Sequence, residues 1–154
     1  MMKLSPIQLL EYHVIHLDVE ACATFDQERP MDLDSADLEV SSETKMLDDG
    51  AEPRWAVSLT VRHEPVEGKN VPYRLLVELV GLVSAIPKTV DDALEHAIAV
   101  NGPSMLFGAA REILRDTTAR GPYGPIVVPS ASFFTPPPTT ERLAPARKRV
   151  KSAK

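Results

Sequence analysis

Hydrophobic and polar residues alternate along the first half of the chain, which is typical of β-strands with one buried face. The first such stretch begins at residue 10, and three more follow it, separated by acidic or turn-forming segments. Residues 25–36 are acidic, contain Pro30 and are expected to form a loop. The pattern therefore predicts four strands, at residues 10–24, 37–46, 55–63 and 73–86.

The predicted strands differ in how apolar their faces are. One face of the first strand carries Ile15, Leu17, Val19 and Ala21, and one face of the last carries Leu75, Val77, Leu79 and Val83. The opposite face of the last strand is polar at first and turns apolar towards its end. A strand with so much apolar surface is expected to lie against a partner.

After Pro87 the spacing of the apolar residues changes to that of a helix. Thr89 and Asp92 resemble a capping box, which predicts a helix start. Asn101-Gly102-Pro103 is expected to interrupt this helix and Pro103 to open a second helical piece. Its apolar stripe is predicted to be Leu106, Ala109, Ala110, Ile113 and Thr117, with Gly121 at its end. The order predicts an α+β fold, a four-stranded antiparallel sheet followed by a long helix packed on one face.

The chain is rich in proline and then in basic residues towards its end. Seven of the 14 prolines fall between Pro122 and Pro145, and Pro136-Pro137-Pro138 predicts extended backbone. Residues 141–154 contain Glu141 and six basic side chains, namely Arg142, Arg147, Lys148, Arg149, Lys151 and Lys154. We therefore divide the chain into a domain of residues 1–134 and a disordered tail of residues 135–154.

Charge and composition narrow the range of functions. The net charge is −5 despite the basic end, so the preceding body is strongly acidic, which argues against nucleic acid as the main partner. The single Cys22 cannot form an internal disulfide, which favours a reducing compartment. The first residues lack the continuous apolar stretch of a signal peptide, and no segment is apolar for long enough to span a bilayer. The sequence predicts a cytoplasmic protein without membrane insertion.

No arrangement of catalytic or ligand-binding residues stands out. His13 and His16 are three positions apart, so a regular strand would place them on opposite faces, which argues against a metal site. Glu20 and Glu78 could act as an acid–base pair, but nothing in the sequence brings them together. Cys22 lacks an identifiable base and is interpreted as a small core residue. We expect no catalysis, no metal and no cofactor.

The second predicted helical piece and the residues after it resemble the central helix of the SecB family of protein-export chaperones. The matching positions are Leu106, Phe107, Ala110, Arg111, Glu112, Ile113, Arg120, Gly121 and Tyr123. The following Ile126, Val127, Val128, Pro129 and Phe133 are similar to the family's apolar run, proline and phenylalanine, although Pro129 comes one residue early. The order of four strands before the helix agrees with the fold of that family.

The resemblance implies a homotetramer, a dimer of dimers with the sheets outside and the helices between. It implies that unfolded preproteins are held in hydrophobic grooves without ATP. Candidates for peptide binding are Phe25, Met31, Leu33, Tyr123, Phe133 and Phe134. The family also docks on SecA, the translocase motor, and the matching positions are Glu20, Leu76 and Glu78. His16 departs from the family, in which aspartate is usual at this position.

The end of the chain departs further from the family, whose members carry a second amphipathic helix after the phenylalanine. Thr135-Pro136-Pro137-Pro138 cannot continue a helix, so a more open groove and a dedicated client are expected. Three alternatives remain open: a SecB-like chaperone paired with a toxin–antitoxin system, a small α+β enzyme, and a tetrameric scaffold that binds no client.

Overall fold

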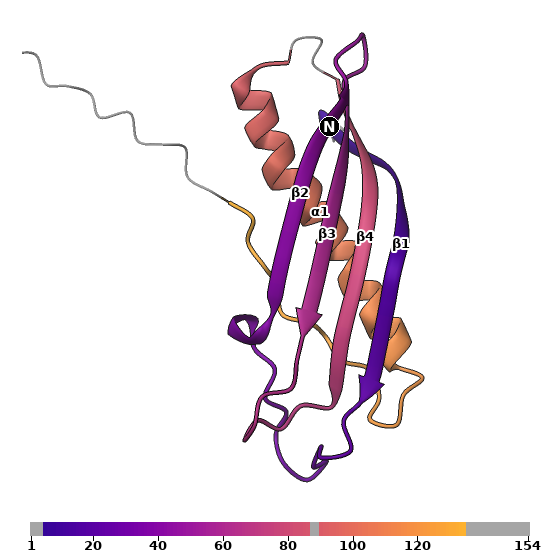
Figure 1. Cartoon of the computed structure of the whole chain (residues 1–154), viewed down its shortest axis with the longest axis vertical. Helices are drawn as coiled ribbons and strands as arrows, with labels where there is room; N and C mark the ends of the chain where they lie inside the picture. Colours follow the sequence, from indigo (N-terminus) through magenta and orange to yellow (C-terminus); the bar gives the residue numbers. More distant parts are fainter. Residues whose placement is uncertain (1–4, 87–89, 135–154) are drawn as a thin grey trace, which may run out of the picture.

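The computed structural model describes residues 5–86 and 90–134. Its strands are β1 (Ile7–Ala21), β2 (Glu39–Asp48), β3 (Arg54–His63) and β4 (Tyr73–Ala85), with a short 3-10 helix, η1 (Ser35–Asp37), before β2. One α-helix, α1 (Asp92–Thr118), comes last (Figure 1). The predicted order of four strands and a helix is confirmed. The predicted tail, residues 135–154, lies outside the described residues, and the division into domain and tail stays a prediction.

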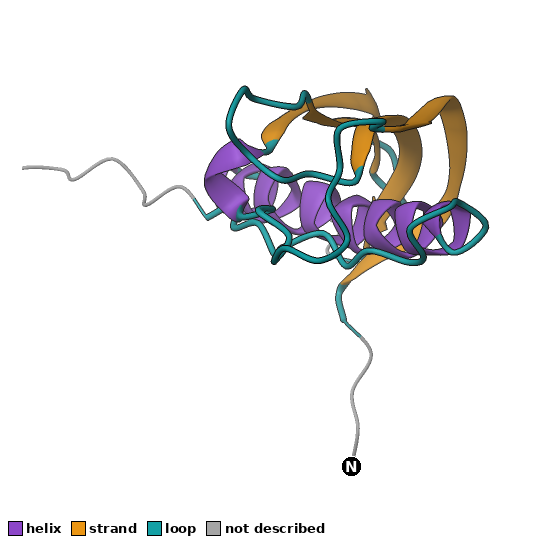
Figure 2. Cartoon of the chain, turned by 90° about the horizontal axis from the view of Figure 1, so that it is seen from below, coloured by secondary structure: helices purple, strands orange, loops and turns teal. Residues whose placement is uncertain are grey.

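The four strands form one antiparallel sheet in the order β1-β4-β3-β2, so β1 and β2 are its edges. Figure 2 shows α1 as a second layer against one side of the sheet, which we call the helix face. The opposite side is the outer face. The helix crosses the sheet diagonally, starting on the β2 side and ending on the β1 side (Figure 1). The predicted α+β fold is therefore confirmed.

The core lies between α1 and the helix face of the two central strands. The alternating residues of the sequence are the ones buried there: Trp55, Val57, Leu59 and Val61 from β3, and Leu75, Val77, Leu79 and Val83 from β4. Burial of one such aliphatic side chain contributes about 1.5–3 kcal/mol. The helix approaches β3 so closely that a Cβ added at Gly102 would lie 2.9 Å from Val57 Cγ2.

The helix is continuous through Asn101-Gly102-Pro103, so the predicted interruption is wrong. An internal proline costs about 3 kcal/mol, because it removes a backbone donor and crowds the preceding turn. Here Gly102 and Pro103 both lie on the buried face. Asn101 Nδ2 donates to Ala97 O at 2.7 Å, and Ser104 Oγ donates to Val100 O at 2.8 Å. Packing of Gly102 and Pro103 against the sheet offsets the cost of Pro103.

The helix also begins at a different cap and turns a different face to the sheet than predicted. Asp91 is the N-cap, and its side chain accepts from Leu94 N at 2.8 Å. The predicted cap, Thr89, lies outside the described residues. The buried stripe is Leu94, Ile98, Leu106, Phe107, Ala110, Leu114 and Thr118. Three residues predicted in that stripe are only half-buried, namely Ala109, Ile113 and Thr117.

Two register shifts interrupt the pairing of β1 with β4, at Leu10 and at Ile15. A bulge adds one residue to a strand and reverses the alternation of faces beyond it. His13 and His16 stand on either side of the second shift, and both pair with positions of β4 that face outward. The prediction that these two histidines lie on opposite faces is therefore wrong.

The edge strand β1 exposes several large apolar side chains. Five of them, which we call the β1 patch, are Leu10, Tyr12, Val14, Ile15 and Leu17. Their exposed fractions run from 39% at Leu17 to 62% at Ile15, so α1 does not cover them. An exposed apolar edge is a surface on which a further strand can pair.

The chain after α1 folds back along the helix, and Figure 1 shows it running from the end of α1 towards the β2 side. Ile126 and Val128 are buried in the core. Ile126 N donates to Thr118 Oγ1 at 3.1 Å, and Arg111 Nε donates to Val128 O at 2.8 Å. Two residues of α1 thus hold the start of the returning segment.

Candidate functional site

An aromatic cluster joins the end of β1 to the chain that follows α1. The centroid of the Tyr123 ring lies 4.9 Å from that of Phe25 and 5.7 Å from that of Tyr73. Tyr123 Oη also donates to Cys22 O at 2.9 Å, across 101 positions of sequence. Aromatic pairs at such distances add about 0.5–1.5 kcal/mol to the effect of burial alone. The cluster therefore fixes two distant segments side by side.

Tyr73 is the buried member of this cluster, with 1% of its surface exposed. Its Oη accepts from Tyr123 N at 3.0 Å and donates to Gly124 O at 3.1 Å. A Cβ added at Gly121 would lie 2.6 Å from the same oxygen. Gly121 does not adopt a positive φ, and α1 ends earlier, at Thr118. The expectation that Gly121 ends the helix is wrong: it leaves room for Tyr73.

Asn70 holds the long loop between β1 and β2, residues 22–38, which we call the crossover loop. The residue is 3% exposed. Its Oδ1 accepts from Asp26 N at 2.9 Å, and its Nδ2 lies 2.9, 3.2 and 3.0 Å from the carbonyl oxygens of Asp26, Arg29 and Pro30, to which it donates. Asn70 N donates to Asp32 Oδ2 at 2.8 Å, and Asp32 N donates to Asn70 O at the same distance. One side chain and its backbone thus define the course of the loop.

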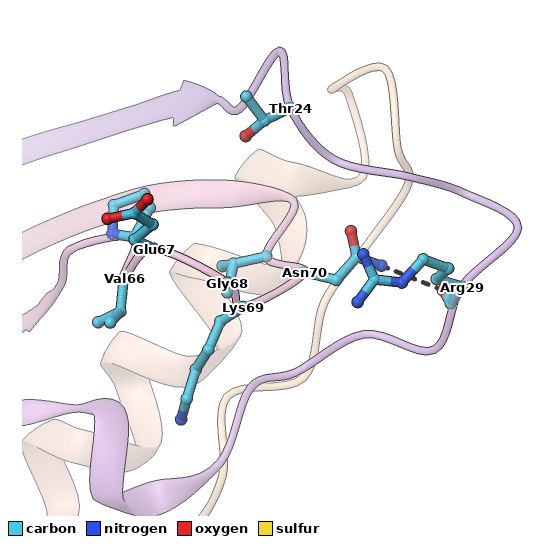
Figure 3. Close-up of a pocket in the computed structure, with 9 residues that line it drawn as sticks. Thr24, Arg29, Val66, Glu67, Gly68, Lys69 and Asn70 are labelled. Carbon is cyan, nitrogen blue, oxygen red and sulfur yellow. Dashed lines mark hydrogen bonds between the residues drawn. The ribbon is translucent and has the colours of Figure 1, made fainter.

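A pocket of about 410 Å³ lies where the crossover loop meets the loop between β3 and β4 (Figure 3). Its lining residues are Thr24, Arg29, Pro65, Val66, Glu67, Gly68, Lys69, Asn70 and Val71. Figure 3 shows Asn70 bonded to Arg29, with the Lys69 side chain directed away from both. The pocket contains none of the six residues predicted to bind peptide. Its lining mixes charged and polar side chains with the apolar Pro65, Val66 and Val71.

The structure spreads the six predicted peptide-binding residues over the crossover loop and the segment after α1. Phe25 and Tyr123 form the aromatic cluster. Leu33 and Phe133 are half-buried and pack against the core, whereas Met31 is 43% and Phe134 65% exposed. Four of the six side chains are thus packed, and Met31 and Phe134 are exposed. Their role in binding stays a prediction.

The residues that organise this region, Asn70 and Tyr73, were not predicted from the sequence. Asn70 follows Gly68-Lys69 in a stretch interpreted only as a connection between strands. The sequence pattern places Tyr73 only at the start of a strand. Each acts through contacts more than 40 positions away. Local patterns carry no signal of such contacts.

The three residues predicted to contact SecA share the outer face of the sheet. Leu76 and Glu78 are half-buried positions of β4, and Glu20 is exposed on the neighbouring β1. Arg74 Nη2 donates to Glu20 Oε2 at 2.7 Å and to Asp18 Oδ2 at 3.0 Å. Ion pairs this exposed contribute at most about 1 kcal/mol. Their larger effect is to offset the negative charge of Glu20 on this surface.

The histidines of β1 share the outer face with acidic side chains. His13 Nε2 lies 4.0 Å from Glu11 Oε1. Within residues 5–86 and 90–134, however, no group of three or more His, Cys, Asp or Glu side chains is arranged to hold a metal ion. The described part of the chain likewise contains no helix that is long and apolar enough to cross a membrane.

Cys22 is half-buried at the start of the crossover loop. Burial raises the pKa of its thiol, and the nearby Glu20 carboxylate acts in the same direction. A cysteine acts as a nucleophile through its thiolate, which this environment disfavours. Because Cys22 is half-buried and lies outside the hydrophobic core, its interpretation as a small core residue is wrong.

Three ionisable side chains meet where η1 packs against the end of β3. Lys69 Nζ donates to Asp37 Oδ1, which lowers the pKa of the Asp37 carboxyl and raises that of the Lys69 ammonium. His63 is completely buried, and burial lowers the pKa of its imidazole. Among the described residues, neither nitrogen of His63 has a hydrogen-bond partner. The folded protein therefore holds His63 in its neutral form.

We expect the protein to lose stability as the pH falls below about 6.5, the ordinary pKa of histidine. In this range the unfolded chain binds a proton at His63, whereas the folded imidazole stays neutral to a lower pH. One such proton lowers the free energy of unfolding by at most about 1.4 kcal/mol per pH unit. Asp37 adds to this loss of stability only at lower pH. Folding lowers the pKa of its carboxyl, so the stabilisation that it provides is complete above the ordinary value of 3.8 and decreases as the pH falls below it.

Urea unfolding of His63→Leu at two pH values, near 7.5 and 5.5, measures this dependence. The variant should lose less stability between them than the wild-type protein. His96→Gln, at an exposed position of α1, is the matched control and should behave as the wild type does. A His63→Leu variant with unchanged pH dependence would assign the effect to another group.

The residues of the helix motif divide between the core and the returning chain. Leu106, Phe107 and Ala110 are buried against the sheet. Arg111 bonds to the returning segment, and Gly121 accommodates Tyr73. The remaining motif positions lie nearer the surface: Ile113 is half-buried, Glu112 pairs with Arg115 at 3.0 Å, and Arg120 is exposed.

Comparison with known proteins gives one family. The model of the family described as preprotein translocase subunit SecB matches residues 7–135. None of the curated proteins compared with the chain matches it. A similar solved structure is that of the Mycobacterium tuberculosis SecB-like chaperone in complex with a ChAD peptide from the HigA1 antitoxin. The two chains are 14% identical, with 82% of this chain and 91% of that chain covered and a TM-score of 0.44.

Proposed function

The chain belongs to the SecB family, and from this premise we propose that it is an ATP-independent chaperone that holds unfolded or slowly folding preproteins for export. The family match over residues 7–135 is the observation that carries this proposal. Exposed apolar side chains on β1, on the crossover loop and after α1 support it. A binder of many unfolded chains needs adaptable apolar surface rather than exact polar pairing.

The β1 patch is the contact between two copies in this proposal. An edge strand offers unpaired backbone groups, and a two-fold axis lets the same edge pair with itself. Side chains that are 39–62% exposed in one copy would be buried by the second. Two such dimers form the homotetramer, with α1 between the sheets and the outer faces towards solvent. This arrangement leaves the crossover loop and the segment after α1 for clients.

The client surface comprises the six predicted residues, Phe25, Met31, Leu33, Tyr123, Phe133 and Phe134. Asn70 and Tyr73 fix its framework, because both are buried and make several long-range hydrogen bonds. The exposed Met31 and Phe134 add apolar side chains that can adjust to different partners. A fixed framework with adjustable side chains lowers the entropic cost of binding an extended chain.

The outer face around Glu20, Leu76 and Glu78 is the docking surface for SecA in this proposal. The double variant Glu20→Lys/Glu78→Lys should weaken binding to SecA about tenfold at low salt and less at high salt, because charge complementarity is screened by ions. Surface plasmon resonance with immobilised SecA measures this. Glu43→Lys, on the outer face but at the β2 edge, is the control. Unchanged binding of the double variant would remove the outer face from the SecA contact.

A chaperone dedicated to a toxin–antitoxin system is the second candidate. Arg74 favours it, because its guanidinium offsets the charge of Glu20 on the surface that SecA would use. His16 in the same region points in the same direction. In either case the protein acts on unfolded chains in the cytoplasm, the compartment that its single cysteine favours.

Capture of unfolded clients tests the proposed function. Two unrelated preproteins and one antitoxin, each denatured in urea, are diluted into buffer with this protein and without ATP. Size-exclusion chromatography should recover soluble complexes with both preproteins. Capture of the antitoxin alone would favour the dedicated chaperone, and capture of none of the three would contradict chaperone function.

A further inference from the structure

Residues 129–134 are held less firmly than the chain before them. Arg111 Nε donates to Val128 O, just before these residues. Among the described residues, no later hydrogen bond joins the returning chain to the rest of the protein. After Val128, the hydrogen bond found among the described residues is a local one, in which Phe134 N donates to Ser132 Oγ at 3.4 Å. The crossover loop differs sharply, because Asn70 holds it through both side-chain and backbone bonds. Of the two, the segment after α1 is the one that can move.

Burial alternates along residues 126–128 and, after a change of phase at Pro129, along residues 129–134, as it does along a strand on a surface. Ile126 and Val128 are buried and Val127 is exposed. Further on, Ala131 and Phe133 are half-buried, while Ser132 and Phe134 are exposed. A chain with apolar side chains at alternate positions therefore fits the surface beside α1.

Among the described residues of this segment, Phe133 packs against another aromatic ring. Its ring centroid lies 5.8 Å from that of Phe107, with the rings inclined at 64° in an edge-to-face arrangement. Phe107 belongs to the buried stripe of α1 and is only 4% exposed. The adjacent Phe134 is 65% exposed and has no part in this contact. Phe133 thus covers an aromatic side chain of the helix.

We propose that residues 129–134 are an internal occupant of the client surface, seated by Phe133 on Phe107, and that an extended client segment with apolar side chains at alternate positions displaces them. The identity of the displacing chain as a client rests on the proposed function. Val128 is the fixed point of the movement, because it is buried and bonded to Arg111.

The exchange replaces one apolar extended segment by another of the same kind. Its outcome depends on concentration, because a tethered segment competes at an effective concentration of about millimolar. A short apolar segment is therefore a weak competitor, whereas a long unfolded chain gains contacts elsewhere on the protein. The occupant makes the surface selective for extended clients and covers Phe107 in their absence.

This role replaces the direct contact with clients given for Phe133 under the proposed function: Phe133 occupies the surface while no client is bound and is not a wall of the groove. Loss of a wall residue weakens binding, whereas loss of an occupant residue strengthens it. The sign of the effect of Phe133→Ala therefore decides between the two roles. Val127→Ala is the control, because Val127 is 61% exposed on the same returning chain but precedes the residues that are displaced.

The probe is a fluorescently labelled peptide with the sequence of residues 126–134, and fluorescence anisotropy measures its binding to the full chain. We expect Phe133→Ala to bind it about tenfold more tightly than the wild type, since truncation of a seated aromatic residue has effects of this size. Val127→Ala should stay within about twofold of the wild type. The proposal would be overturned if Phe133→Ala bound the peptide no more tightly than the wild type does, or if none of the three proteins bound it. Because the peptide comes from this chain, the result is independent of preprotein capture.

Hydrogen exchange of the wild-type protein provides a second readout if Phe133→Ala does not fold. Addition of a denatured preprotein should speed the exchange of the amides of residues 130–134. Slower exchange of these amides on client addition would show that the segment closes over the client and would contradict displacement.

Discussion

A Val14→Lys/Ile15→Lys variant should fall below the mass of a tetramer at micromolar concentration, because it removes one of the two contacts of the proposed assembly. Ile15 is 62% and Val14 46% exposed in the single subunit, so their replacement changes the core little. In the proposed assembly, each subunit would place two lysines against the same residues of its partner. The loss of apolar burial is about 1.5–3 kcal/mol per side chain, and charge repulsion adds to it. Weakening of subunit association by at least about a hundredfold follows.

Light scattering at several protein concentrations measures the effect. Ser41→Lys, on the other edge strand β2, places the same charge on an exposed edge position and is the control. It should keep the mass of the wild type. A double variant that remains tetrameric would exclude the β1 patch as the interface, and a monomeric wild-type protein would contradict the assembly itself.

Asn70→Asp should destabilise the protein by about 3 kcal/mol and loosen the crossover loop, because buried carbonyls lose their donor and face a carboxylate instead. The amide of Asn70 donates to the backbone of Asp26, Arg29 and Pro30. Aspartate is nearly the same size, so the change isolates the hydrogen bonds from packing. Urea unfolding near pH 7 measures the loss of stability.

Asn101→Asp is the matched control for this substitution. Asn101 is exposed on α1, and its amide donates to one carbonyl within the helix. The control should lose much less stability than Asn70→Asp. Equal losses in the two variants would mean that Asn70 does not define the course of the crossover loop.

The fold could be predicted from the sequence because the two central strands are regular. Residues alternate strictly in β3 and β4, and the side chains on one face of each are buried by α1. The local alternation of apolar and polar residues is sufficient to identify which face of each strand is buried. The antiparallel sheet with one helix on one face followed directly from that pattern and from the order of the elements.

Features that depend on contacts across the sheet were not predictable in the same way. The shift at Ile15 exists only in the pairing of β1 with β4, and it places His13 and His16 on one face. Gly102 and Pro103 look like a helix end in sequence, but the close approach to Val57 keeps them within α1. In both cases tertiary packing decides against the local preference.

The candidate site could be predicted in part. The aromatic residues Phe25 and Tyr123 were selected from the family resemblance, and the structure places their rings 4.9 Å apart. Phe133 was selected as a residue that binds peptide, and the structure shows it packed on Phe107. Asn70 gave no signal, because its partners lie about 40 positions earlier in the chain.

The most direct test of chaperone function is the refolding rate of a denatured preprotein, with and without near-stoichiometric amounts of this protein and in the absence of ATP. We expect a marked delay in refolding, because a client held in extended form cannot fold until it is released. The same rate with and without the protein, for several unrelated preproteins, would contradict a general holding function.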